Sequence, residues 1–170
     1  MILDRDGTIN IEKNYLFRIE EFEFIAGVPE TIRSLNKSGF KVIVITNQSG
    51  IARGYFTEDE VRKLHGYINQ ELGKYAAHID AFYVCPHHPD EGCECRKPNT
   101  KLYTAALKEW EIDTARSYMV GDKTTDLTPG KQLGMKTILV ETGYGKQQIY
   151  DARYCDYQVE SLKEIIKILC

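Results

Sequence analysis

Short apolar segments alternate with longer amphipathic segments along the 170 residues of the chain. Residues 41–46 are β-branched and almost continuously apolar, which is typical of a strand buried on both faces. Strands that alternate with helices at this spacing predict βαβ units, and therefore a parallel sheet flanked by helices. The predicted strands are 1–3, 41–46, 81–85, 117–120 and 136–140, and the predicted helices are 29–37, 57–74, 100–110, 127–133 and 161–169.

Local signals at the starts of two predicted helices refine these boundaries. Thr57 is followed three residues later by Glu60, which is the pattern of a capping box at a helix N-terminus. Pro129 lies inside the segment 127–133. Proline has no amide hydrogen and clashes with the preceding turn, so we expect Pro129 in the first turn of that helix.

The charge balance and the hydropathy pattern exclude several classes of protein. The 22 Lys and Arg and the 25 Asp and Glu are intermixed and give a net charge of −3, which disfavours a general nucleic-acid-binding protein. The longest aliphatic run is residues 42–45, whereas a membrane span needs roughly 20 apolar residues. No charged and then apolar leader is visible. We therefore expect one cytoplasmic domain, residues 1–170, that binds neither nucleic acid nor membrane.

Three of the five cysteines, Cys85, Cys93 and Cys95, lie close together in the sequence. An odd count without a leader disfavours a disulfide framework, and clustered cysteines in the cytosol more often bind metal. With His87 or His88 they supply three thiolates and one imidazole, which form a closed, structural, tetrahedral zinc site. The spacing alone does not choose between the two histidines.

The remaining cysteines and histidines carry no comparable pattern. Cys155 and Cys170 are isolated in the sequence, and we interpret them as ordinary thiols. His65 and His78 lie on or near the predicted helix 57–74 and are interpreted as packing or surface residues.

Acidic residues follow two of the predicted strands. Asp4 and Asp6 are two positions apart, so they project to the same side of an extended segment, and Gly7 permits a sharp turn after them. Asp122 follows the strand 117–120. Since parallel strands end at one edge of a sheet, these carboxylates would meet there and would favour Mg²⁺. The alternative is that they only form turns and cap helices.

Phosphate ligands follow another strand and the cysteine cluster. Thr46 is followed by three polar residues, and together they offer a hydroxyl, amides and free backbone N–H groups. Arg96 and Lys97 form a cationic pair before Pro98. The three polar residues after Thr46 are Asn47, Gln48 and Ser49.

These residues resemble the four motifs of the haloacid dehalogenase (HAD) superfamily phosphatases, in the same order and across almost the whole chain. The four matching positions are Asp4 to Thr8 (DRDGT), Thr46, Lys97 and the pair Gly121–Asp122. The cysteine loop that runs directly into Arg96 and Lys97 is similar to the branch of heptose bisphosphate and histidinol-phosphate phosphatases. Residues 46–57 and 118–123 are closer to the heptose type. The five residues between His87 and Cys93 are closer to the histidinol type.

The resemblance implies a three-layer, Rossmann-like fold of the HAD type and an aspartyl-phosphate mechanism. It implies that Mg²⁺ is held by Asp4, Asp122 and the backbone carbonyl of Asp6. Asp4 would be the nucleophile and Asp6 the general acid and base, while Thr46 and Lys97 would bind the phosphoryl group. It also implies that the fourth ligand of a structural zinc ion is His87.

The resemblance also implies a substrate-contacting flap, which consists of Glu12, Lys13, Asn14 and Tyr15. A sugar bisphosphate needs cations for its second phosphate, and Arg53, Arg96 and Lys123 could supply them. Histidinol phosphate carries an amine and an imidazole and would favour carboxylates, which residues 46–54 lack. We therefore expect removal of the 7-phosphate of D-glycero-D-manno-heptose 1,7-bisphosphate, with histidinol phosphate as the alternative.

The spacing of the motifs leaves little room for a cap domain. Only 41 residues separate Asp4 from Thr46, and 50 separate Thr46 from Lys97. We therefore expect a capless, monomeric enzyme with an open site for a small phosphorylated metabolite. A phosphomutase would need a cap to shield its intermediate. A zinc-stabilised binding module without catalysis would have no need for this set of acidic and basic residues.

Overall fold

A computed structural model describes residues 1–169 and contains one six-stranded parallel sheet in the order β3-β2-β1-β4-β5-β6. The predicted fold class is therefore confirmed. The strands are β1 (Ile2–Leu3), β2 (Ile43–Asn47), β3 (Ala81–Cys85), β4 (Tyr118–Gly121), β5 (Lys136–Val140) and β6 (Tyr157–Val159). Cys170 lies outside the described residues.

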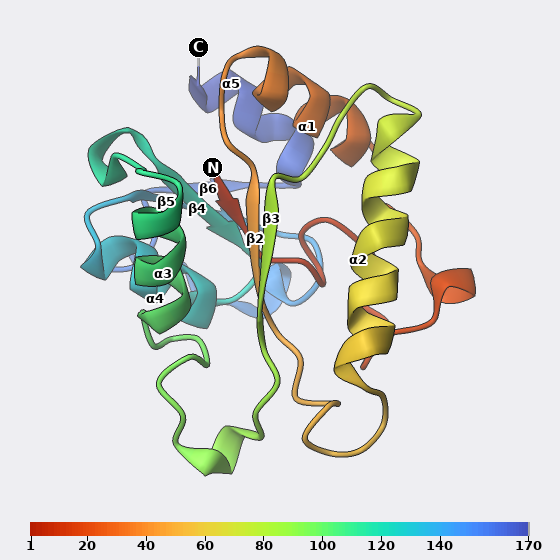
Figure 1. Cartoon of the computed structure of the whole chain (residues 1–170). Helices are drawn as coiled ribbons and strands as arrows, with labels where there is room; N and C mark the ends of the chain where they lie inside the picture. The colour runs from red at the N-terminus through yellow and green to blue at the C-terminus, as the bar shows by residue number, and fades with distance from the viewer. Residues whose placement is uncertain (170) are drawn as a thin grey trace.

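Helices cover both faces of the sheet, as Figure 1 shows. One face packs against α1 (Val28–Lys37), α2 (Glu58–Gly73) and the C-terminal turns, and the other packs against α3 (Lys101–Glu109) and α4 (Thr124–Gln132). The strands supply both cores because alternate residues point to opposite faces: Leu3 belongs to the first core and Ile2 to the second.

The shortest strand of the sheet occupies one of its central positions. Strand β1 has only two residues, but it pairs in parallel with β2 on one side and with β4 on the other. The N–H of the next residue, Asp4, donates to the Val120 carbonyl at 2.9 Å. Ile2 and Leu3 are completely buried. Backbone pairing on both sides therefore fixes the position of Asp4 at the end of this strand.

The helix that follows β4 differs from the prediction. Helix α4 begins at Thr124, so Pro129 lies in its second turn and the expectation of a first-turn position was wrong. The start is fixed because the Asp126 carboxylate accepts the Lys123 N–H at 3.0 Å. Pro129 is buried against the sheet and removes one intrahelical hydrogen bond, which the nine-residue helix tolerates.

Two features of the C-terminal third also differ from the prediction. The segment 161–169 is a 3₁₀ turn (Leu162–Ile165) followed by one α-helical turn, α5 (Ile166–Leu169), and not one amphipathic helix. Strand β6 was not predicted. It has three residues at the edge of the sheet, too few for an alternating pattern to show. In contrast, the capping box of Thr57 and Glu60 at the start of α2 is confirmed.

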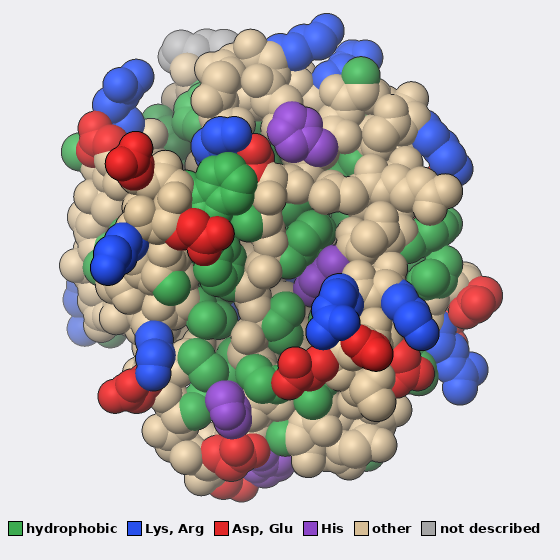
Figure 2. All heavy atoms as spheres, viewed as in Figure 1, with side chains coloured by type: hydrophobic (Ala, Val, Ile, Leu, Met, Phe, Trp, Pro, Cys, Tyr) green, Lys and Arg blue, Asp and Glu red, His purple; other side chains and the backbone are tan. Residues whose placement is uncertain are grey.

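The surface of the molecule carries both signs of charge. Figure 2 shows acidic and basic side chains interspersed over the face that it presents. Among residues 1–169, no helix is long and apolar enough to cross a membrane.

Candidate active site

The polar residues predicted at the strand ends meet at the carboxyl edge of the sheet, around a cavity of about 360 Å³. Asp4 follows β1, Thr46 lies near the end of β2, and Lys97 enters from the loop after β3. Asp122, which follows β4, is completely buried beside this cavity. Twelve predicted residues line it: Asp4, Asp6, Glu12, Asn14, Tyr15, Thr46, Asn47, Gln48, Ser49, Arg96, Lys97 and Lys123.

Lys97 is buried between two carboxylates. Its Nζ lies 2.7 Å from Asp4 Oδ1 and 2.7 Å from Asp126 Oδ1, and it donates to the Ile45 carbonyl at 2.8 Å. Burial by itself lowers the pKa of Lys97, but the carboxylates of Asp126 and Asp4 outweigh this effect and raise the pKa above its ordinary value. Lys97 is therefore a fixed positive charge at the floor of the cavity.

Asp4, Asp122 and Asp126 place carboxylate oxygens within 4.8 Å of one another, and all three residues are buried. Burial, together with the Asp126 carboxylate, raises the pKa of Asp122 to about 6, and the same two causes raise the pKa of Asp4. Asp122 Oδ2 accepts the Tyr144 N–H at 2.8 Å, whereas Oδ1 is buried without a hydrogen-bond partner. A buried cluster with an unsatisfied oxygen fits a hard divalent cation such as Mg²⁺.

Asp126 is the site residue that sequence reasoning missed. It lies in the first turn of α4, where its carboxylate also accepts the Lys123 N–H, and no role was predicted for it from the sequence. Its position four residues after Asp122 was the available signal. Thr125 and Tyr144 also line the cavity without having been predicted.

Two glycines allow the chain to pass directly over the Asp122 carboxylate. A Cβ on Gly143 would lie 2.2 Å from Asp122 Oδ2, and a Cβ on Gly7 would lie 2.3 Å from the same oxygen. Both glycines have positive φ, 58° and 79° respectively. No side chain larger than hydrogen fits at either position without displacing Asp122.

The Asp6 carboxylate does not belong to the acidic cluster and is held by hydrogen-bond donors. It accepts hydrogen bonds from Arg5, from Asn10 at 3.0 Å and from Gln48 at 2.8 Å. Burial would raise the pKa of Asp6, but Arg5 and these hydrogen bonds outweigh it and lower the pKa. Asp6 is therefore an oriented, ionised carboxylate on the wall of the cavity.

The residues after β2 connect the parts of the site. Gln48 Nε2 donates to Thr46 Oγ1 at 2.8 Å as well as to Asp6, so one side chain orients both. Asn47 was predicted to contact substrate. Asn47 lines the cavity, and its side chain accepts the Lys97 N–H at 3.0 Å and donates to the Lys97 carbonyl at 3.2 Å, so it also fixes the backbone of Lys97.

The structure separates the predicted flap and cationic residues into two groups. Glu12, Asn14 and Tyr15 line the cavity, but Lys13 points away because its Nζ donates to the Glu21 carbonyl at 2.6 Å. Arg53 is exposed, outside the cavity, with its guanidinium 5.9 Å from the centre of the Tyr15 ring. Of the three cations predicted for the second phosphate, Arg96 and Lys123 therefore line the cavity and Arg53 does not.

The cysteine cluster forms a compact four-residue site. The Sγ atoms of Cys85, Cys93 and Cys95 are 3.3 to 3.6 Å apart, and His87 Nδ1 lies 3.1 Å from Cys95 Sγ and 3.7 Å from Cys85 Sγ. These separations are close to the edges of a tetrahedron around a metal ion with bonds of about 2.3 Å to sulfur. His88 instead lies beside Asp90. The geometry is therefore that of a metal site formed with His87.

The other cysteines and histidines occupy ordinary positions. The Cys155 thiol is buried and donates to the Tyr157 carbonyl at 2.9 Å. His78 is exposed on the surface, and His65 packs in the interior against Phe82. The interpretation of Cys170 falls outside the described residues.

Comparison with known proteins assigns this site to a class. A family model described as HAD-hydrolase-like matches residues 94–165. The heptose bisphosphate 7-phosphatase of Haemophilus ducreyi is 42% identical to this chain, and the match covers 84% of this chain and 83% of that protein. The corresponding enzyme of Pasteurella multocida is 39% identical, and the match covers 99% of this chain and 95% of that protein. The D,D-heptose 1,7-bisphosphate phosphatase of B. bronchiseptica, solved with magnesium and phosphate, has a TM-score of 0.91 at 32% identity and covers 99% of this chain and 96% of its own.

The fold and the site are those of a phosphatase of the HAD class. The chain belongs to the D-glycero-β-D-manno-heptose-1,7-bisphosphate 7-phosphatase family.

Proposed function

We propose that this protein is a Mg²⁺-dependent phosphatase that removes the 7-phosphate of D-glycero-β-D-manno-heptose 1,7-bisphosphate. The observation that supports the proposal is that the residues lining one cavity form a buried part and a half-exposed part. Lys97 and the carboxylates of Asp4 and Asp126 are buried, whereas Arg96 and Lys123 supply positive charge from half-exposed positions on the same cavity. A substrate with two phosphates needs both parts, which agrees with the names of the family members.

The carboxylates would hold the metal ion at the floor of the cavity. Asp4 and Asp122 would coordinate Mg²⁺ together with the backbone carbonyl of Asp6, and Asp126 adds a third carboxylate to the cluster. The ion supplies charge neutralisation, which lets a phosphate dianion approach these acidic groups. The B. bronchiseptica relative, which was solved with magnesium and phosphate, supports this assignment.

Asp4 is proposed as the nucleophile. Its carboxylate oxygen attacks phosphorus in line, the bond between phosphorus and the sugar oxygen breaks, and an aspartyl-phosphate forms. Asp6, which must carry a proton at this point, gives it to the leaving sugar oxygen and becomes a carboxylate. Water then attacks the same phosphorus, Asp6 removes its proton, and inorganic phosphate leaves as the Asp4 carboxylate is restored. The donors around Asp6 lower its pKa, which favours the carboxylate that the second step uses and makes the acid that the first step uses the minor form.

Thr46 and Lys97 are proposed to hold the phosphoryl oxygens. The positive charge of Lys97 is maintained by Asp4 and Asp126, so it can offset the charge that develops in the transition state. Since Asn47 holds both backbone groups of Lys97, the position of this charge is fixed before substrate binds.

The metal bound by Cys85, His87, Cys93 and Cys95 is proposed to be a structural zinc ion, because three thiolates and an imidazole leave no open coordination position. Arg96 follows the last ligand directly in the sequence. Zinc binding would thereby fix the loop that presents Arg96 and Lys97. We further propose a cytoplasmic, monomeric enzyme, as expected from the sequence; the site residues named here all belong to one chain.

A histidinol-phosphate phosphatase is the second candidate. It is favoured by the five-residue spacing between His87 and Cys93 and by Glu12, whose carboxylate lies in the cavity and could pair with an amine.

The decisive experiment compares kcat/KM for the β and α anomers of the heptose bisphosphate, histidinol phosphate and an aryl phosphate, each with and without Mg²⁺. We expect the β anomer to be the best substrate and all turnover to require the metal. A higher kcat/KM for histidinol phosphate would overturn the substrate assignment, and turnover in metal-free buffer would overturn the mechanism.

A further inference from the structure

The guanidinium of Arg5 is completely buried next to the proposed acid and base, Asp6. Its Nη2 donates to Asp6 Oδ2 at 2.8 Å and to Oδ1 at 2.9 Å, and its Nε lies 3.2 Å from the same Oδ1. The Nη2 group also donates to the Leu16 carbonyl at 3.0 Å. A planar guanidinium that contacts both oxygens of a carboxylate fixes the plane of that carboxylate.

The remaining guanidinium nitrogen, Arg5 Nη1, contacts His65 Nε2 at 3.2 Å. Arginine can only donate, so His65 Nε2 must be the acceptor, and the imidazole must be neutral with its proton on Nδ1. Burial, together with the nearby positive charge of Arg5, lowers the pKa of His65 to about 3, which keeps the ring neutral at physiological pH. His65 therefore holds the arginine from the side opposite the active site.

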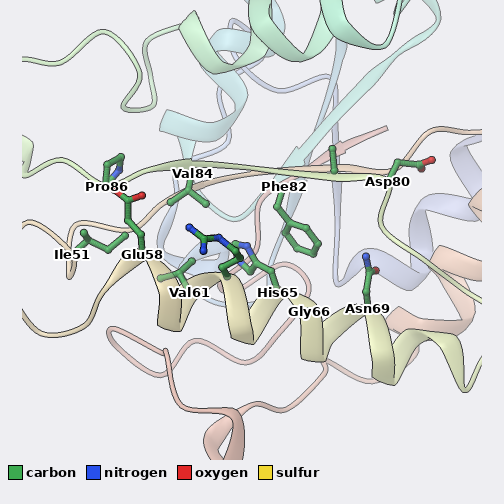
Figure 3. Close-up of a pocket in the computed structure, with 12 residues that line it drawn as sticks. Ile51, Glu58, Val61, His65, Gly66, Asn69, Asp80, Phe82, Val84 and Pro86 are labelled. Carbon is green, nitrogen blue, oxygen red and sulfur yellow. The ribbon is translucent and has the colours of Figure 1, made fainter.

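The orientation of His65 is itself fixed by packing. Its ring stacks on Phe82 of β3 with a centroid separation of 4.2 Å and an interplanar angle of 14°. Figure 3 shows both rings on the wall of a second cavity, between α2 and β3. This cavity has a volume of about 550 Å³ and is distinct from the one that contains Asp6. A continuous series of contacts thus runs from Phe82 through His65 and Arg5 to Asp6.

We infer that Arg5 and His65 are positioning residues for Asp6, and that His65 acts on the reaction only through the orientation of the Asp6 carboxylate. This inference rests on the proposed function, in which Asp6 must reach first the leaving sugar oxygen and then the attacking water. Both transfers require a heavy-atom separation of about 2.6 to 3.2 Å, so a small displacement of the carboxylate slows both.

The test compares two substitutions of similar size, His65→Leu and His65→Gln. Leucine cannot accept a hydrogen bond from Arg5, whereas the glutamine amide oxygen can. We expect His65→Leu to lower kcat about tenfold with little change in KM, because the lost hydrogen bond involves a charged group. His65→Gln should retain most of the kcat. An equal loss of kcat in both variants would show that the acceptor is irrelevant and would overturn the inference.

A double-mutant cycle with Asp6→Asn separates positioning from general damage. If His65 acts only through Asp6, His65→Leu should cause no further loss of single-turnover rate in an Asp6→Asn background. Multiplicative losses would instead identify His65 as an independent structural residue and would contradict the inference. The single variant Asp6→Asn tests the proposed function separately, because an unchanged rate there would remove Asp6 from the mechanism. Circular dichroism establishes that each variant is folded.

Discussion

The ammonium group of Lys97 lies 2.7 Å from the carboxylate of Asp4, although the two residues are 93 positions apart in the sequence. Both are buried, and Asp126 approaches the same ammonium group from a third segment. Lys97 therefore stabilises two carboxylates that would otherwise repel each other. It links the cluster of buried carboxylates to the loop that carries the cysteine cluster.

Removal of the Lys97 charge is expected to affect both activity and stability. Lys97→Met would leave Asp4 and Asp126 buried without their cation, and we expect a free energy of unfolding lower by about 3 kcal/mol. We also expect kcat to fall by at least about 100-fold, since a charge that contacts the phosphoryl group is lost. Urea denaturation and phosphate release measure the two effects. Lys101→Met, at an exposed lysine near Glu94, is the matched control and should change neither.

Replacement of the nucleophile should abolish catalysis without unfolding the protein. Asp4→Asn keeps the shape of the side chain and its proximity to Lys97, but an amide cannot form the aspartyl-phosphate. We expect no phosphate release and no acid-stable phosphoenzyme after quenching, while the thermal unfolding midpoint remains close to that of the parent chain. Near-normal turnover by this variant would show that Asp4 is not the nucleophile. Asp59→Asn, at an exposed position on α2, controls for the change in net charge.

Loss of one thiolate should release the metal of the cysteine cluster. We expect Cys93→Ser to bind less than a stoichiometric amount of zinc and to unfold at a lower temperature, because the metal crosslinks the loop through four side chains. Elemental analysis and differential scanning calorimetry provide the two readouts. Cys155→Ser removes a thiol outside the cluster and should retain full zinc content. If Cys93→Ser also kept its full zinc content, the assignment of the ligands would be wrong.

The glycine above Asp122 gives a test of the magnesium site. Gly143→Ala would place a methyl group 2.2 Å from Asp122 Oδ2, so we expect the apparent Mg²⁺ affinity in the phosphatase assay to fall about tenfold or more. Gly39→Ala has a similar positive φ of 81° but open space around the new methyl group. Gly39→Ala should lower only the free energy of unfolding. An equal loss of Mg²⁺ affinity in both variants would show that backbone strain, and not the contact with Asp122, causes the effect.

The buried histidine predicts a sensitivity to acid. The pKa of His65 is lowered to about 3 in the folded chain, compared with 6.5 when the residue is unperturbed. Between these two values the unfolded chain binds more protons, so His65 makes the folded state less stable as the pH falls from 6.5 towards 3. The slope reaches at most about 1.4 kcal/mol per pH unit. His65→Gln should flatten the stability profile over this range in urea titrations, and a profile that stays as steep as that of the parent chain would contradict the prediction.

The arrangement of the main site could be predicted because it depends on topology. Asp4, Thr46 and Asp122 each lie where a strand ends, and the parallel order of the strands brings these ends together. The cysteine cluster was equally predictable, since its four ligands lie within eleven residues of sequence. Strand β6 could not be predicted, because three residues at an edge show no period.

The directions of individual side chains were less predictable. Lys13 was expected to face the substrate, but its amine is bound to the Glu21 carbonyl, and the adjacent residues Asn14 and Tyr15 adopt positive φ, which no local pattern indicated. Asp126 was missed because one carboxylate serves both the helix start and the ion pair with Lys97. Such dual roles depend on contacts between distant segments, and a short motif does not contain them.

The short central strand also has a consequence for how the protein acquires its activity. Strand β1 pairs with β2 and β4, and the residues that surround Asp4 extend to Tyr144 near the other end of the chain. Contacts between residues so distant in sequence form late and slowly during folding. A partly folded chain without β4 beside β1 would have neither Asp122 nor Asp126 near Asp4. The recovery of phosphatase activity on refolding would therefore report completion of the whole sheet, while the cysteine loop, which is local in sequence, could bind its metal much earlier.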